Sequence, residues 1–244
     1  MGVDGTEREH SKIKKSAAAL AFGMAVAIQS TALHGGNAAM RTEHKKIDVV
    51  SLIRSKNDVF ITIDDGWFPN NKVLQLIKDE RIPTTTFLIG YALREHKEFW
   101  KEYAKYGSIQ DHTVDHPFLT RISNREAVYQ IKTDKHMIKD VTGSSPYMLR
   151  PPYGSYNKYV LDDAAKSGMR YLVMWSAEVP INRYGYINEP FRLETYDGKK
   201  LHGGEIILMH WDPGMYKEFK MLMRTIKEDG LKVGSLGAYL RKKT

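Results

Sequence analysis

From about Val59 onward, short β-branched or aromatic runs alternate with amphipathic segments, and this alternation limits the fold more than any other feature of the chain. Such runs are typical of buried strands, and apolar residues at helical spacing indicate helices between them. The expected strands are 59–63, 84–90, 108–110, 147–150, 170–175 and 205–210. The expected helices are 71–80, 96–107, 123–143, 157–168 and 218–230, before a last short strand and helix. Repeated β-then-α units predict an α/β protein with a parallel sheet, either open or closed into a barrel.

Residues capable of chemistry stand at the carboxyl ends of five of these strands. They are Asp64 and Asp65, His112 and His116, Arg150, Glu178 just past its strand, and His210. Each has an ordinary explanation, because an Asp pair before glycine is often a turn, and a histidine pair or an arginine before prolines can be incidental. The carboxyl ends of parallel barrel strands share one face, so these residues are expected to converge on one site. The other histidines are expected to have no such role: His34, His44, His96, His136 and His202.

The composition narrows the kind of site. The chain of 244 residues is 42% hydrophobic and 27% charged, which suits a folded domain with a sizeable core. It has no cysteine, which excludes thiol nucleophiles, disulfides and cysteine metal sites, so a transition-metal site must use His, Asp and Glu. The net charge of +8 favours anionic surfaces such as cell-wall polymers or a membrane face. The basic residues form no stripe interleaved with aromatics, so no nucleic-acid partner is expected.

The first 39 residues have the pattern of an export signal. Three lysines at positions 12, 14 and 15 precede an apolar run at 16–28, and small residues follow at 36–39. The run is shorter than the roughly 20 residues of a membrane span, so no stable span is expected in the mature chain. An uncleaved anchor or a buried helix is the alternative. The signal predicts an exported protein, extracellular or associated with the cell envelope, with a charged lead-in at 40–56 before the folded domain.

Four motifs resemble those of the polysaccharide deacetylases, the NodB-homology or carbohydrate esterase family 4 group. They are TIDDG (62–66), HTVDH (112–116), RPPYG (150–154) and ILMH (207–210), in the order that the family has them. The resemblance covers roughly residues 57–242 and implies that 57–244 form a distorted (β/α) barrel of about seven strands. It also implies a divalent metal, zinc first and cobalt or another divalent ion as the alternative. The implied activity removes N- or O-linked acetyl groups from a polysaccharide such as peptidoglycan, chitin oligomers or acetylxylan.

The resemblance also assigns roles. Asp65, His112 and His116 resemble the family's metal ligands, Asp64 its general base, Arg150 the residue that holds this base, and His210 the general acid. Two imidazoles and one carboxylate leave positions open for water and substrate, as a hydrolytic metal site needs. Asp64 would accept the proton of the attacking water and His210 would protonate the leaving group. The metal and a backbone N–H near Tyr153 would stabilise the oxyanion.

The chain departs from the family's pattern in one motif. Glu178 stands where the first Asp of the fourth motif is expected, and Ile181 and Asn182 replace its Asp-Trp pair. What tunes His210 is therefore open: Glu178 either substitutes for the missing Asp or is a loop carboxylate in water. Asp111 either supports a metal ligand from behind or is a solvated turn residue.

Several apolar and aromatic side chains are candidates for substrate contact. Tyr153, Trp67 and Trp211 are expected to stack on sugars, Leu208 to line an acetyl pocket, and Trp175 to belong to the core. Two rival functions remain: a carbohydrate-binding protein on this fold with impaired catalysis, and another enzyme with two His and one carboxylate, such as an iron oxygenase. A second carboxylate beside the ligand Asp, together with Arg150, favours hydrolysis. Nothing in the chain indicates a protein partner.

Overall fold

The computed structural model describes residues 46–181 and 191–242. The predicted signal or anchor at 1–39, residues 40–45 of the lead-in, His34, His44 and Asn182 lie outside the described residues. Among the described residues, no helix is long and apolar enough to cross a membrane.

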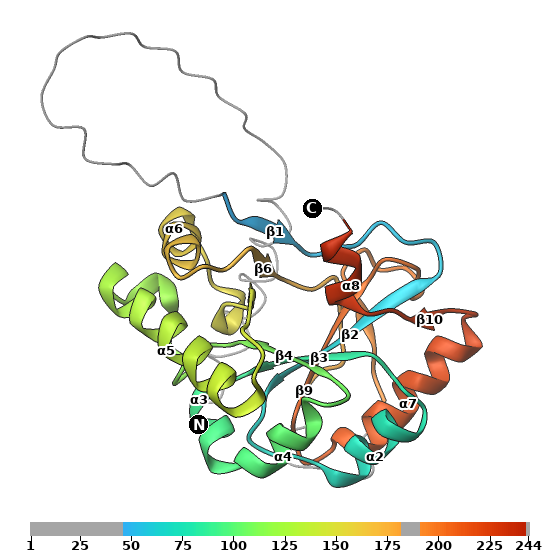
Figure 1. The fold of residues 1–244 in the computed structure, drawn as a ribbon. Coiled ribbons are helices and arrows are strands. Elements are labelled where there is room, and N and C mark those ends of the chain that lie inside the picture. The colour runs from blue at the N-terminus through green and yellow to red at the C-terminus, as the bar shows by residue number, and fades with distance from the viewer. Residues whose placement is uncertain (1–45, 182–190, 243–244) are drawn as a thin grey trace, which may run out of the picture. The chain divides into compact units, whose positions relative to one another are not determined.

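A curled sheet of ten strands forms the centre of the fold (Figure 1). Its order is β1-β6-β5-β4-β3-β2-β9-β7-β8, with β10 paired to β2, and every pairing is parallel except β7 with β8. The strands are β1 (Asp48–Val50), β2 (Asp58–Asp65), β3 (Thr84–Leu88), β4 (Ser108–Asp111), β5 (Met148–Leu149), β6 (Tyr171–Val173), β7 (Ala177–Glu178), β8 (Glu194–Thr195), β9 (Ile206–His210) and β10 (Lys232–Val233). The predicted α/β barrel-like fold is confirmed, as a half-barrel. β1 was not expected, because its segment was interpreted as a charged lead-in.

Most helices cover the outside of the sheet, and the last one packs against Phe60 on the opposite face (Figure 1). They are α2 (Asn71–Asp79), α3 (Gly90–Glu95), α4 (Lys97–Tyr103), α5 (Asn124–Thr142), α6 (Lys158–Lys166), α7 (Met215–Glu228) and α8 (Leu236–Arg241), with two 3-10 turns at η1 (Leu119–Arg121) and η2 (Pro152–Gly154). The helix expected at 96–107 corresponds to α4, and the short helix α3 before it was not expected. The two are separate because the backbone leaves the helical region at His96 (φ −122°, ψ 38°).

Alternation along β2 divides its side chains between two environments. Val59, Ile61 and Ile63 belong to the hydrophobic cluster that includes residues of α2, α4 and α7. Phe60 belongs to a second cluster with Leu236 and Leu240 of α8. Because side chains alternate across a strand, Thr62 and Asp64 follow Phe60 on the inner face. On β9, Leu208 is in register with Thr62, and His210 with Asp64, so these four residues share that face.

Helix α5 buries an unusual stripe. Ser123 caps its start by accepting a hydrogen bond from the Glu126 N–H (3.2 Å), and Gly143 ends it in the left-handed conformation (φ 74°), as expected from the sequence. Its buried residues recur at helical spacing, but two of the five are polar: Ala127, Gln130, Ile131, Asp134 and Ile138. These two polar residues face the loop after β4.

Candidate metal centre and active site

Three potential metal ligands meet at the carboxyl ends of β2 and β4. The Nε2 atoms of His112 and His116 are 3.2 Å apart, and each lies 3.5 Å from Asp65 Oδ1. A tetrahedral zinc ion with bonds of about 2.0–2.1 Å separates its ligand atoms by about 3.3–3.4 Å. The triangle of donor atoms therefore fits a divalent metal without rearrangement.

The end of β2 sends its two carboxylates in different directions. Asp64 keeps the strand conformation, whereas Asp65 (φ 74°) and Gly66 (φ 102°) turn the chain through left-handed backbone. A Cβ on Gly66 would lie 2.2 Å from Leu88 Cδ1, so only glycine fits this turn. The turn directs Asp65 toward both imidazoles and leaves Asp64 on the inner face.

The electrostatics of the three ligands favour metal binding. Burial alone would raise the pKa of Asp65, but its hydrogen bond with His112 and the nearby histidine charges hold that pKa well below its usual value. Burial and the charge of His112 lower the pKa of His116 to about 4, so this imidazole is neutral. Burial lowers the pKa of His112, but the charges of Asp64 and Asp65 outweigh it and the net pKa is raised. A metal ion bound to His112 Nε2 would take the place of the proton that the raised pKa favours on this ring.

The ring of His112 is held in a ligand's orientation. Its Nδ1 lies 2.7 Å from the carbonyl oxygen of Arg150, so Nδ1–H donates there and Nε2 is left for a metal. The loop beyond it contains two residues in left-handed backbone, Thr113 (φ 69°) and His116 (φ 65°). As Pro117 indicated, the two histidines come from a loop and not from a long helix.

Two α5 side chains that the sequence interpretation missed contact this loop. Asp134 Oδ2 accepts a hydrogen bond from the His112 N–H (3.0 Å). Gln130 Oε1 accepts from the N–H groups of Val114 (3.1 Å) and Asp115 (3.3 Å). The available signal was polar residues on the apolar stripe of the predicted helix 123–143.

Asp111 supports the same loop and is not a solvated turn residue. It is fully buried, and its Oδ1 accepts a hydrogen bond from the Thr113 N–H (3.0 Å). Its Oδ2 and Asp134 Oδ1 have no donor among the described residues. Burial raises the pKa of both carboxyl groups, and the two interact directly. The pair therefore holds a proton that two isolated carboxylates would not.

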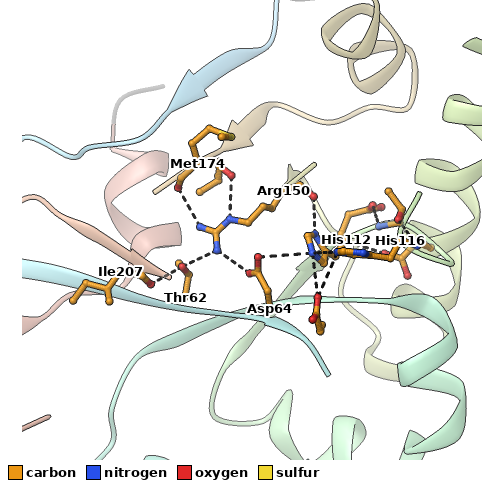
Figure 2. Close-up of polar contacts among 12 residues, drawn as sticks. Thr62, Asp64, His112, His116, Arg150, Met174 and Ile207 are labelled. Carbon is orange, nitrogen blue, oxygen red and sulfur yellow. Dashed lines mark hydrogen bonds and ion pairs between the residues drawn. The ribbon is translucent and has the colours of Figure 1, made fainter. Parts of the chain in front are cut away.

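Arg150 holds the carboxylate of Asp64, the residue at the end of β2 that is not a metal-ligand candidate, as Figure 2 shows. Its NH1 donates to Asp64 Oδ1 (2.8 Å) and Thr62 Oγ1 (2.9 Å). The rest of the guanidinium, which is fully buried, donates to the carbonyl oxygens of Val173 and Met174 (both 3.1 Å). The other oxygen, Asp64 Oδ2, lies 3.7 Å from His112 Nε2 and so faces the metal position.

His210 ends β9 beside Asp64 on the inner face. Its Nδ1 is buried and has no hydrogen-bond partner among the described residues. Glu178 Oε2 instead accepts hydrogen bonds from Trp175 Nε1 (3.2 Å) and Tyr196 OH (2.9 Å). Glu178 therefore does not take the place of the missing acid through a hydrogen bond to His210 Nδ1.

The candidate substrate contacts divide in two. Tyr153 is 53% exposed, packs edge-on against His116 (4.5 Å between ring centroids) and stacks on Phe118 (3.8 Å). Trp67, which directly follows the Asp-Asp-Gly turn at the end of β2, is also exposed. The expectation for Trp211 is wrong: it is 1% exposed, and its Nε1 donates to Thr86 Oγ1 (3.2 Å), because it packs in the core between the sheet and α4.

Two further apolar residues lie on or near the same strands. Leu208 is buried two residues before His210 on the same face of β9, and its contact with an acetyl group stays a prediction. Trp175 is partly buried against the cluster that contains Phe60 and Val173. Its indole contacts Glu178 and Tyr196, as described above.

A second group of metal-type ligands lies near the amino end of β9. Asp197, His202 and Glu205 place one donor atom each within 4.8 Å of the others. His202 Nε2 is 3.1 Å from Asp197 Oδ2 and 3.8 Å from Glu205 Oε1. Lys199 Nζ lies 3.4 Å from the same Asp197 oxygen and already neutralises it, so we interpret this group as an ion-pair cluster.

The comparisons with known proteins agree with this geometry. The family model for polysaccharide deacetylases matches residues 53–172. The uncharacterized protein SCO4760 of Streptomyces coelicolor is 29% identical over 198 residues, which cover 79% of this chain and 77% of that protein. The peptidoglycan-N-acetylglucosamine deacetylase PgdA of Listeria monocytogenes is 27% identical over 173 residues, which cover 68% of this chain but only 34% of PgdA.

The solved structures show the same fold. A mutant of BA3943, a carbohydrate esterase family 4 (CE4) pseudoenzyme with restored enzymatic activity, superimposes with a TM-score of 0.67 at 25% identity. The match covers 79% of this chain and 71% of that one, and the wild-type pseudoenzyme comes from Bacillus anthracis. The chain therefore belongs to the polysaccharide deacetylase family, carbohydrate esterase family 4.

Proposed function

We propose that the chain is a metal-dependent hydrolase that removes acetyl groups from a polysaccharide. One observation carries the proposal: the Asp64 carboxylate, held by a fully buried Arg150, lies 3.7 Å from His112 Nε2 at the edge of a three-donor site. A binding protein needs neither the second carboxylate nor the buried arginine. Zinc suits the His-His-Asp donor set and the spacing of its atoms, and cobalt or another divalent ion could replace it.

Each residue of the site has its own role in the proposed reaction. A divalent ion held by Asp65, His112 and His116 would lower the pKa of water and polarise an acetyl carbonyl. Asp64 accepts the proton of the attacking water through Oδ2, because Arg150 occupies Oδ1. The Tyr153 N–H donates to the developing oxyanion, and His210 then gives a proton to the leaving nitrogen or oxygen. A carboxylate and an imidazolium supply a base and an acid of opposite charge.

Peptidoglycan is the substrate that we favour among the acetylated glycans. The net charge of +8 favours an anionic matrix, and the PgdA relative is named for peptidoglycan N-acetylglucosamine. The exposed Tyr153 ring beside His116 offers a platform for a sugar ring. The signal-like pattern at 1–39 leads us to propose an exported enzyme that acts at the cell envelope.

The test is acetate release from peptidoglycan, chitooligosaccharides and acetylxylan, with chelation and metal readdition as controls. We expect acetate release that chelation stops and added zinc or cobalt restores. Asp64→Asn should keep the metal and lose a factor of about 10²–10⁴ in turnover, as removal of a general base does. Full activity of Asp64→Asn would refute the base assignment, and oxygen-dependent turnover with tightly held iron would replace hydrolysis by oxygenase chemistry.

Two observations favour a second function, a carbohydrate-binding protein with impaired catalysis. His210 Nδ1 has no partner among the described residues, and the fold is shared with a wild-type pseudoenzyme. Binding of peptidoglycan without acetate release from any of the three glycans, in the metal-loaded protein, would establish this alternative.

A further inference from the structure

Side chains of helix α5 hold the loop that carries His112 and His116 by accepting hydrogen bonds from the loop's backbone. Three N–H groups of the loop, those of His112, Val114 and Asp115, donate to only two α5 side chains, Asp134 and Gln130. Both side chains are almost completely buried, at 0% and 3% exposure. They stand four residues apart, so they lie on the same helix face, one turn from each other.

Further hydrogen bonds orient Gln130 and fix the other side of the loop. Gln130 Nε2 donates to Glu126 Oε1 (3.1 Å), which turns the amide oxygen of Gln130 toward the loop. On the other side of the loop, the N–H groups of Gly90 and Tyr91 at the start of α3 donate to the carbonyl oxygens of Thr113 and Val114 (both 3.0 Å). The loop is therefore fixed through its N–H groups by α5 and through its carbonyl groups by α3.

The loop needs such support because its conformation is unfavourable by itself. Thr113 and His116 both adopt left-handed backbone, which is a strong outlier for a β-branched residue such as threonine. Conformations of this kind persist only where surrounding contacts determine them. Here the conformation is also what brings the two imidazole Nε2 atoms to 3.2 Å from each other.

We propose that Gln130 and Asp134 are positioning residues, which hold residues 112–116 in the conformation that aims both imidazoles at a metal ion. They touch neither metal nor substrate and act through the loop backbone. The inference rests on the proposed function only in that it takes Asp65, His112 and His116 as metal ligands. It adds two residues of α5, outside the four sequence motifs, to the machinery of the site.

The test measures metal affinity instead of turnover. Gln130→Met and Asp134→Leu keep the approximate size of each side chain and remove the acceptor oxygen. Asp134→Asn keeps an acceptor for the His112 N–H and can donate to the free oxygen of Asp111. Ile131→Val is the matched control, because Ile131 is fully buried on the same stripe and contacts neither histidine through a hydrogen bond.

Each variant, first stripped of metal, is titrated with Co²⁺ in competition with a chromophoric chelator, and its absorption spectrum is recorded. Gln130→Met and Asp134→Leu should raise the Co²⁺ dissociation constant by about 10- to 100-fold and alter the spectrum, as loss of an outer support does. Asp134→Asn should restore affinity and spectrum. Ile131→Val should lower the melting temperature and leave both unchanged.

The outcomes separate this proposal from the proposed function. Wild-type affinity in Gln130→Met and Asp134→Leu would overturn it, as would equal weakening by Asp134→Asn and Asp134→Leu, since the accepting oxygen would then not matter. Normal Co²⁺ binding by the wild-type chain without acetate release would sink the deacetylase reaction alone and leave the positioning role standing. Failure of the wild-type chain to bind any divalent ion would overturn both.

Discussion

The two His-and-carboxylate groups of this molecule have nearly the same chemistry and very different surroundings. Asp65, His112 and His116 form a triangle of donor atoms in which His112 is 2% exposed, and the loop that carries the histidines is held by two helices. The second group, Asp197, His202 and Glu205, has a His202 side chain that is 43% exposed and an Asp197 already paired with Lys199. Suitable residue types within reach of one another do not make a metal site. Among the described residues, the first group differs from the second in its burial, in its fixed backbone and in a ligand carboxylate that pairs with the two histidines and with no lysine.

Removal of one histidine from each group tests most directly whether only the first group binds metal. His112→Ala should abolish tight binding of zinc and reduce acetate release by at least about 10³-fold, because the several kcal/mol of transition-state stabilisation from the ion would be lost. His202→Ala should change neither metal content nor turnover. Metal content by elemental analysis and initial rates on the preferred glycan measure the two effects.

Loss of bound metal in His202→Ala would reverse our interpretation of the second group. Retention of one tightly bound ion per chain in His112→Ala would equally show that the first group is not the metal centre. Each variant thus serves as the control for the other.

The ion pairs beside the two groups offer a second comparison. Arg150 and Asp64 are buried, whereas the Lys199 side chain is 74% exposed. Arg150→Met leaves a buried carboxylate unpaired, so it should lower the free energy of unfolding by about 3–5 kcal/mol and the melting temperature by roughly 6–20 °C. Lys199→Met should leave the melting temperature unchanged, because water and salt already screen that pair.

Both variants are melted after chelation, so that loss of metal does not contribute to the shift. Equal melting temperatures for Arg150→Met and wild type would show that Asp64 does not depend on Arg150 for its counter-charge. Asp64 would then need another partner to stay aimed at the metal position.

Much of the fold and the contents of the site followed from short patterns. The strand-end positions of Asp64, Arg150 and His210 could be predicted because strand runs and helical spacing are local patterns. Their convergence could be predicted because parallel strands end on one face of the sheet. The caps of α5 at Ser123 and Gly143 were legible for the same reason.

What could not be read from the sequence depends on contacts between distant segments. Trp211 was expected to contact the substrate as one of several aromatic candidates, yet its side chain packs in the core against Trp100. Gln130 and Asp134 were interpreted only as part of an amphipathic helix, since nothing local shows that their partners are backbone groups of another segment. Glu178 was weighed as a partner of His210, but its contacts with Trp175 and Tyr196 depend on where β8 pairs.

The buried carboxyl pair behind the first group predicts a pH effect on stability that salt should not remove, unlike that of the exposed second group. Burial raises the pKa of Asp111 and of Asp134 in the folded protein above the value of about 3.9 for an unfolded Asp. The folded state therefore binds more protons than the unfolded state above that value. The stability that these protonated groups contribute is complete below pH 4 and is lost as the pH rises through the folded pKa. Asp134→Asn removes one of the two titrations.

The metal-free wild type should therefore lose stability relative to Asp134→Asn between pH 5 and pH 8, by at most about 1.4 kcal/mol for each unit of pKa shift. Urea unfolding of both proteins across this range gives the difference, in which the titrations of His112 and His116 largely cancel. His202→Gln provides the contrast, because the pKa of His202 is raised by a hydrogen bond to Asp197 at the surface. The small pH dependence of stability that His202 contributes should vanish in 0.5 M salt. The pH dependence from the buried pair should persist, since salt does not screen charges inside the protein. A constant difference between wild type and Asp134→Asn at every pH would show that the pair carries no extra proton, and the support behind His112 would then rest on hydrogen bonds alone.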